Sequence, residues 1–355
     1  CSRCPDATSM PRPQVGRRYH PTMSFFAILC ALLIEQVRPL AYHNPVYGAV
    51  LAWTRWTSRN FDAGKPHHGW VAWLLAVGVP SLLALGIHWL LLLTLPLPFA
   101  VLWSIAVLYV TLGFRQFSHH FTGIRDALEV GDEALARSLL AHWQRVDAAD
   151  LPRSEIVRHV IEYSVIAAHR HVFGVLAWFS VLAALGLGPA GAVFYRMSEF
   201  VARYWAHKNN ASIQPASVWV QEAADRAWAA IDWLPARITA LGFAVVGSFE
   251  EAIDCWRNDA RRFPDPNDGV ILAATSGALN VRLGGGQLRA IAVADALPHA
   301  QAGDPVSGMA VLDSGSTPGR EPEPGHLRSV VGLVWRSVVM WMVLLALLTL
   351  ARLLG

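Results

Sequence analysis

Long apolar blocks alternate with short polar segments along this chain, and the block from Trp70 to Phe114 is the longest of them. It contains no Asp, Glu, Lys or Arg, and it has room for two membrane-spanning helices, at about 70–93 and 97–114. A turn between them is expected at Pro96 and Pro98, because proline lacks the N–H group that a continuous helix needs.

Four further apolar blocks differ in length, and length decides what each of them can do. A helix that crosses the bilayer needs about 20 apolar residues. Residues 172–195 and 330–354 reach this length, so each block predicts a span. Residues 23–37 are short and predict a tilted or partly interfacial helix, while residues 236–249 predict a re-entrant or interfacial helix.

Residues 122–162 carry charged and apolar positions at helical spacing, which predicts one or two amphipathic helices outside the bilayer. We therefore expect an all-α fold, a polytopic membrane helix bundle with extramembrane amphipathic helices and a Gly-rich polar loop. The expected divisions are a disordered leader at 1–22, a membrane domain at 23–286, a linker at 287–329 and a C-terminal transmembrane helix at 330–355.

Composition supports a membrane protein and excludes other classes. The chain is 54% hydrophobic and 15% charged, whereas soluble domains carry about 25% charged residues. The lipid bilayer is therefore the expected partner, and a net charge of +3 is too small to indicate nucleic acid. Arginine-bearing loops at 38–69 and 115–170 place both segments in the cytoplasm of a multi-pass inner-membrane protein. Cys1 and Cys4 lack a second ligand pair, so no metal site is predicted.

The polar loop at 265–286 is the first candidate site. Its Asn, Asp and Gly residues expose backbone N–H groups, and Arg282 stands beside Gly284 and Gly285, an arrangement that can cradle a phosphate. It is not a nucleotide-binding P-loop, because the Gly-Lys-Ser/Thr ending is missing. The alternative is an ordinary turn followed by a small helix and a Gly-rich hinge.

Two charges form the second candidate site, at the start of the short apolar block 236–249. Asp232 and Arg237 would be costly at membrane depth, and such charges are often functional. The alternative is an interfacial anchor, with Trp233 among the lipid headgroups and Arg237 extended towards the water.

Carboxylates of the central region form the third candidate site. Glu155 and Glu162 are seven residues apart and share one face of a continuous helix, and Asp147 precedes them. Such carboxylates could hold Mg²⁺ together with nucleotide phosphates, or they could be a solvated helix face. His169, Arg170 and His171 are neighbours that point to different helix faces, so a two-histidine metal site is not expected there.

Two motifs resemble the CobD/CbiB family of cobalamin biosynthesis, whose pieces agree in order with residues from about 24 to 286. The stretch from Asp265-Pro-Asn-Asp-Gly269 to Gly277-Ala-Leu-Asn-Val-Arg-Leu-Gly-Gly285 is similar to the family's Ser-Pro-Asn-Ala-Gly and Gly-Ala-Leu-x-Val-x-Leu-Gly-Gly. Asp232-Trp-Leu-Pro-Ala-Arg-Ile-Thr-Ala240 is similar to its Trp-Ile-Pro-Ala-Arg-Leu-Thr-Ala. Tyr195-Arg196 resembles the pair that follows its central span.

The resemblance implies a function and a set of site residues. It implies an ATP- and Mg²⁺-dependent synthase that joins adenosylcobyric acid, a corrinoid, to aminopropanol or its phosphate by an amide bond. Together with the carboxylate pattern described above, it makes Asp147, Glu155, Glu162 and Asp232 the predicted catalytic residues. The residues implied for substrate or phosphate binding are Arg237, Asn267, Gly269, Gly277, Arg282, Gly284 and Gly285. Assembly into a homo-oligomer is left open.

One departure from the family pattern keeps a second function open. The family's Glu-Asn-x-Ser-Asp-Gly stretch corresponds here to residues 169–174, where only the glycine is kept. A related membrane protein, AmpE, is linked to β-lactamase regulation and resembles this chain at Met23–Leu29 and at Asp232–Arg237. The alternative function is therefore a non-enzymatic, AmpE-like signalling protein. Carboxylates near Arg282 would favour the enzyme, and histidines without carboxylates would favour signalling.

Overall fold

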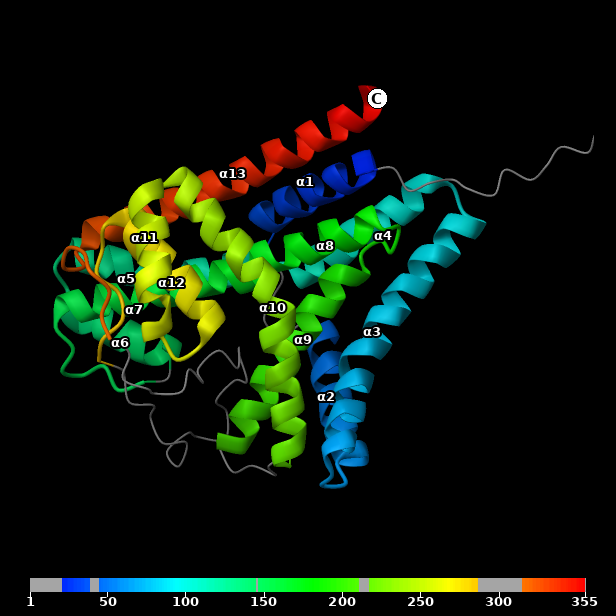
Figure 1. The fold of residues 1–355 in the computed structure, drawn as a ribbon, viewed down its shortest axis with the longest axis horizontal. Helices are drawn as coiled ribbons and strands as arrows, with labels where there is room; N and C mark the ends of the chain where they lie inside the picture. Colours follow the sequence, from blue (N-terminus) through cyan, green and yellow to red (C-terminus); the bar gives the residue numbers. More distant parts are fainter. Residues whose placement is uncertain (1–20, 39–44, 145, 211–216, 287–314, 355) are drawn as a thin grey trace, which may run out of the picture.

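A computed structural model describes residues 21–38, 45–144, 146–210, 217–286 and 315–354, and these ranges are helical almost throughout (Figure 1). Most of the predicted leader at 1–22 and most of the predicted linker at 287–329 lie outside the described residues, while Pro21 and Thr22 already belong to the first helix. The all-α bundle expected from the hydrophobic pattern is confirmed.

Within the described ranges, four helical segments are long and apolar enough to cross a membrane: Pro66–Thr94, Arg153–Ala184, Val218–Val246 and Pro324–Ala351. The first is α3, and α4 (Leu97–Thr111) follows it after the expected proline turn. With 15 residues, α4 is shorter than the other spans. The last is most of α13 (Pro324–Leu354), which begins six residues before the predicted start at 330.

The central span is longer than predicted and begins earlier. Helix α7 (Arg153–Ala168), the π-helix η1 (His169–Phe173) and α8 (Gly174–Ala184) form one continuous rod. The prediction that the span covers 172–195 was wrong, because a glycine turn ends the rod at Ala184 and α9 (Ala190–Asn210) starts afresh. The hydrophobic pattern did not predict this part of the span because α7 carries charged residues. Inside the protein these residues form ion pairs with one another.

The prediction of a short re-entrant or interfacial helix at 236–249 was also wrong. Residues 236–246 belong to α10 (Val218–Val246), a helix of 29 residues with Pro235 in its interior. The upstream half of α10 is polar on one side, while small residues on the other side pack into the bundle. Those buried small residues include Ala223, Ala224 and Ala227.

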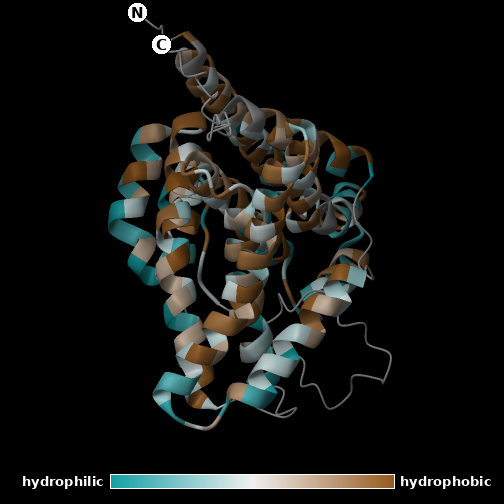
Figure 2. Ribbon diagram, turned by 90° about the vertical axis from the view of Figure 1, so that its right-hand side faces the viewer, coloured by the Kyte–Doolittle hydropathy of each residue, from teal (hydrophilic) through white to brown (hydrophobic). Residues whose placement is uncertain are grey.

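The remaining helices surround the rods. Helices α1 (Pro21–Val37) and α13 lie side by side, as do α2 (Pro45–Phe61) and α3 (Figure 1). Helices α5 (Phe114–Glu129) and α6 (Glu133–Gln144) are amphipathic, as predicted for this region, and both pack on α7. The rest of the predicted amphipathic segment, residues 153–162, belongs to the central span instead. Figure 2 shows hydrophilic residues gathered at the lower end of the molecule, where α2 meets α3.

Helix α12 (Pro266–Leu279) positions the polar loop, and it is buried along nearly its whole length. It packs between α10 and α11 (Phe249–Asp259), and the short helix η2 (Ala260–Arg262) leads into it. The Asp265 carboxylate caps its first turn by accepting the N–H groups of Asn267 and Asp268. Its C-cap, Asn280, has a φ of 51°, which turns the chain into the Gly-rich loop.

Candidate functional site

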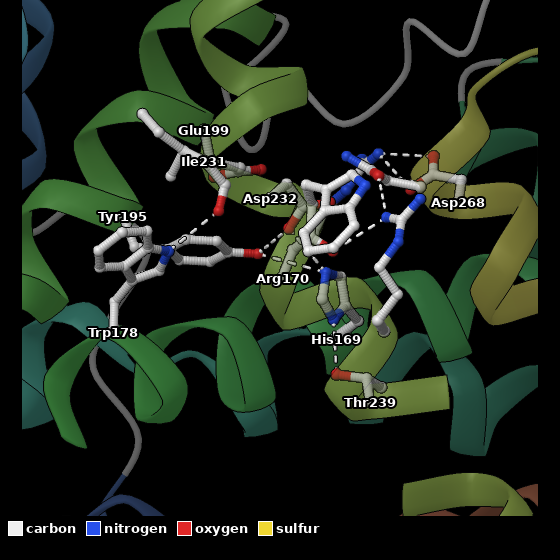
Figure 3. A network of polar contacts seen from close by, with 12 residues as sticks. His169, Arg170, Trp178, Tyr195, Glu199, Ile231, Asp232, Thr239 and Asp268 are labelled. Carbon is white, nitrogen blue, oxygen red and sulfur yellow. Dashed lines mark hydrogen bonds and ion pairs between the residues drawn. The ribbon is translucent and has the colours of Figure 1, made fainter. Parts of the chain in front are cut away.

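A group of buried polar side chains lies where η1, α9 and α10 meet (Figure 3). His169 Nε2 lies 2.8 Å from Asp232 Oδ1, and His169 Nδ1 lies 2.9 Å from the Thr239 hydroxyl. The Tyr195 hydroxyl donates to the same Asp232 oxygen at 2.7 Å. All four side chains are buried. We call His169, Tyr195, Asp232 and Thr239 the central cluster.

The local backbone explains how these groups meet. A π-helix places an extra residue in the turn, and His169, Arg170 and His171 are all buried there rather than distributed over different faces of an exposed helix. Gly174 follows directly, and any side chain at this position would overlap the Tyr195 ring. The glycine that the family pattern keeps therefore lets Tyr195 reach the cluster.

Arg170 connects the π-helix to α12. Its Nη2 atom lies 2.9 and 2.6 Å from the two carboxylate oxygens of Asp268, and its guanidinium lies 5.9 Å from the centre of the Trp228 ring. Burial raises the pKa of Asp268 to about 7, although the Arg170 charge acts in the opposite direction. Burial likewise raises the pKa of Tyr195 well above its ordinary value, so this phenol stays neutral and donates its hydrogen.

Three buried polar atoms in this region have no hydrogen-bond partner among the residues that the structure describes. They are Asp232 Oδ2, Arg170 Nε and His171 Nδ1. Buried polar atoms in native proteins are almost always hydrogen-bonded, to water or ligand where protein groups are missing. The region can therefore accept water or a polar group of a substrate.

Arg237 and Asn267 lie at the edge of the same region, and the structure brings these two predicted site residues together. Arg237 Nη1 donates to the Asn267 side-chain oxygen at 2.6 Å, and the guanidinium lies 4.4 Å from the centre of the Trp233 ring. Asn267 in turn donates to the carbonyl of Ala229 at 2.9 Å. Arg237 is half-buried, so its remaining donors can reach an anion from outside.

Glu155 and Glu162 do share a helix face, but an arginine lies between them. Arg158 pairs with Glu155, and its Nη1 atom lies 3.0 Å from Glu162. The N–H group of Gly284 donates to Glu162 at 2.7 Å, and Arg158 donates to the carbonyl of Gly286. The sequence predicted that the Gly284 N–H would bind a phosphate. In the structure this N–H is already hydrogen-bonded to a carboxylate of the protein.

The predicted glycines serve the packing of the polar loop. Gly269 and Gly277 lie within α12, where a side chain would overlap the carbonyl of Ala260 or the backbone of Glu251. Gly284 and Gly285 have φ values of 78° and 105°, which favour glycine. Whether any of them also contacts a substrate stays a prediction.

Two predicted residues lie on the surface, and no described hydrogen bond or ion pair links either side chain to the central cluster. Asp147 is exposed, and its carboxylate accepts the N–H of Ala149 at 3.2 Å. The Arg282 side chain is exposed beside the Gly-rich loop, while its backbone N–H donates to the carbonyl of Arg320 at 2.8 Å.

Sequence reasoning missed His169, Arg170, Thr239 and Asp268 as site residues. The signal was available for the first two, because ionisable residues inside an apolar span are usually functional. Residues 169–174 lack the acidic groups of the corresponding family stretch. Two carboxylates from other helices, Asp232 and Asp268, lie beside His169 and Arg170 instead.

Similarities to known proteins extend over most of the chain. Residues 24–310 match the family model described as CobD/Cbib protein. Cobalamin biosynthesis protein CobD of Stutzerimonas stutzeri is 31% identical over 327 residues, which cover 90% of this chain and 96% of that protein. Cobalamin biosynthesis protein CobD of Chromobacterium violaceum is 35% identical over 182 residues, which cover 51% of this chain and 55% of that protein. No solved structure matches.

Proposed function

Because the chain belongs to the CobD/CbiB family of cobalamin biosynthesis proteins, we propose that it joins adenosylcobyric acid to aminopropanol or aminopropanol phosphate by an ATP-dependent amide bond. The observation that carries this proposal is the arrangement around α10. A half-buried cation, Arg237, stands at the edge of a region whose interior holds a paired histidine and carboxylate, His169 and Asp232.

The proposed reaction has two steps. ATP transfers its terminal phosphoryl group to a carboxylate of the corrinoid, which gives an acyl phosphate and ADP. The amine of aminopropanol then attacks the acyl carbon, the C–O bond to phosphate breaks, and the amine loses a proton. Phosphate leaves with the electron pair of that bond, and an amide remains.

Each step needs a group that the site contains. Arg237, held by Asn267, would bind the carboxylate and then stabilise the negative charge of the acyl phosphate. His169 would accept the proton of the amine at Nδ1 through the Thr239 hydroxyl, because its Nε2–H donates to Asp232. Asp232 would hold the imidazole in one orientation and stabilise its charged form.

The nucleotide contact is a separate part of the proposal. Arg282, exposed beside the Gly-rich loop, is the proposed contact for ATP phosphates. The described residues contain no group of three or more His, Cys, Asp or Glu side chains that could hold a metal ion. Glu162 and Asp268 each face an arginine, so these residues do not fit a resident Mg²⁺ ion, and the ion is proposed only as a companion of ATP.

Complementation tests the proposal. A strain that lacks its cobalamin synthase, supplied with cobyric acid, would express the chain under selection for cobalamin-dependent growth. We expect growth with the unaltered chain and with Arg226→Ala, an exposed arginine on the same helix. We expect no growth with Arg237→Ala, although the protein is present in the membrane.

Two outcomes would contradict the proposal. Normal growth with Arg237→Ala would remove this residue from the site. Absence of growth with the unaltered chain, present in the membrane at the level of a working synthase, would favour the non-enzymatic AmpE-like function instead. Location of the chain as a multi-pass protein of the inner membrane is part of the same proposal.

A further inference from the structure

A seam of basic residues lies between α2 and α9, at the lower end of the molecule in Figure 1. Arg55 and Arg59 are four residues apart on α2, and Tyr204 and Lys208 are four residues apart on α9. Residues at this spacing share one helix face, so each helix contributes a row of two.

Contacts bring the two rows together. Arg55 Nε donates to the Tyr204 hydroxyl at 2.8 Å, and the Arg55 guanidinium lies 5.9 Å from the centre of the same ring. The partner of this arginine is thus a neutral phenol. Partial burial lowers the pKa of Lys208, and the nearby charges of Arg59 and Arg55 lower it further, so three cations lie within electrostatic reach of one another.

The carboxylate of Asp62 lies near the seam. Its negative charge raises the pKa of Lys208, but this effect is smaller than the lowering by burial and by the two arginines. Its two oxygens accept backbone N–H groups from Gly64 at 3.2 Å and from Ser217 at 2.6 Å. Asp62 therefore fixes the chain turns at this end of the molecule and leaves the seam with an excess of positive charge.

The surroundings of the seam resemble a membrane interface. Trp56, Trp70 and Trp219 are exposed on α2, α3 and α10. The start of α3, a span, adjoins the start of α10, since a side chain at Gly69 would overlap the carbonyl of Trp219. Exposed tryptophans gather at the headgroup level of bilayers, where cations also meet acidic lipids.

We propose that the seam formed by Arg55, Arg59, Tyr204 and Lys208 is a binding site for the phosphate group of an acidic phospholipid. A phosphate between the rows would relieve the repulsion among the three cations and accept hydrogen bonds from the arginines. The glycerol and acyl chains would continue along the exposed, mostly apolar face of α2 above Arg55. This site is independent of the proposed synthase site.

Lipid binding to the purified chain tests the inference. Phosphatidylglycerol and phosphatidylcholine with identical acyl chains would be titrated into detergent-solubilised protein, and bound lipid would be measured by native mass spectrometry. We expect phosphatidylglycerol to bind more tightly. Arg55→Gln and Lys208→Gln should each weaken it about fivefold, the effect of about 1 kcal/mol for each cation near a lipid surface.

Matched controls make the result specific. Arg226→Gln removes the same charge from an exposed position on α10, and it should leave the affinity unchanged. Thermal unfolding of each variant in lipid-free detergent would confirm that it is folded. Equal affinity for both lipids, or equal weakening by Arg226→Gln, would overturn the proposal. Inorganic phosphate that binds as tightly as the lipid would also overturn it, and would indicate a site for soluble phosphate compounds.

Discussion

At the scale of single residues, glycines set the tightest steric limits in the fold. Gly277 in α12 faces the backbone of Glu251, whereas Gly78 in α3 has open space around it. We expect Gly277→Ala to lower the free energy of unfolding by about 1–3 kcal/mol, because backbone cannot move aside cheaply.

Gly78→Ala is the matched control for this substitution. It should be neutral, or stabilising by up to about 1 kcal/mol, since alanine favours a helix interior over glycine. Thermal unfolding of detergent-solubilised protein measures both variants. Equal midpoints for the two would mean that α11 and α12 are packed less closely than the structure has them.

Asp232 is the residue on which the proposed chemistry depends most. Asp232→Asn keeps its shape but removes the charge that holds His169, so we expect the rate of amide formation in isolated membranes to fall about 100-fold or more. Asp225→Asn, an exposed position on the same helix, should keep the normal rate. An unchanged rate for Asp232→Asn, at matched protein content, would exclude the central cluster from the reaction.

At the scale of elements, the Arg170–Asp268 pair couples the π-helix to α12. Burial holds the pKa of Asp268 at about 7 in the folded state, against an ordinary value of 3.8. The folded state therefore binds this proton more tightly than the unfolded state does. The resulting stability is fully present below about pH 4 and is lost as the pH rises through about 7.

This coupling predicts a dependence of unfolding on pH. We expect the thermal midpoint to fall between pH 5 and pH 8, and to fall more steeply in Arg170→Met, where the buried carboxylate has lost its cation. Asp268→Asn removes the titrating group and should flatten the profile between these values. A slope unaffected by Asp268→Asn would assign the dependence to another group.

At the scale of the whole molecule, the helix order predicts sidedness. The loop before α3 and the turn between α5 and α6 carry Gly64 and Gly131, which we expect on the cytoplasmic side, while Pro96 between α3 and α4 should lie on the opposite side. Single cysteines at these positions, in a chain without its native cysteines, would be treated in intact cells with a thiol reagent that cannot cross membranes.

The expected result is reaction at Pro96→Cys alone. Disruption of the cells should then make Gly64→Cys and Gly131→Cys reactive as well, because both positions are exposed in the structure. Reaction at all three positions in intact cells would contradict the proposed orientation.

Sequence determined much of this protein because hydrophobic pattern and turn chemistry act locally. The α3–α4 hairpin, the terminal span, the amphipathic α5 and α6, and the family could all be predicted from neighbouring residues. So could the shared face of Glu155 and Glu162, since helical spacing alone decides it. The predicted span boundaries were wrong where charged residues such as Arg158 and Glu162 form ion pairs inside the protein, because a hydropathy pattern treats every charged residue as exposed.

Only the tertiary structure decided the composition of the site. His169 meets Asp232 across 63 residues of sequence, Arg170 meets Asp268 across 98, and Glu162 meets the Gly-rich loop across 122. Such partners are selected by how helices pack and by the need to satisfy buried charges, which no local pattern encodes. For the same reason His169-Arg170-His171, a departure from the family when read in sequence, lies beside carboxylates from distant helices once the chain is folded.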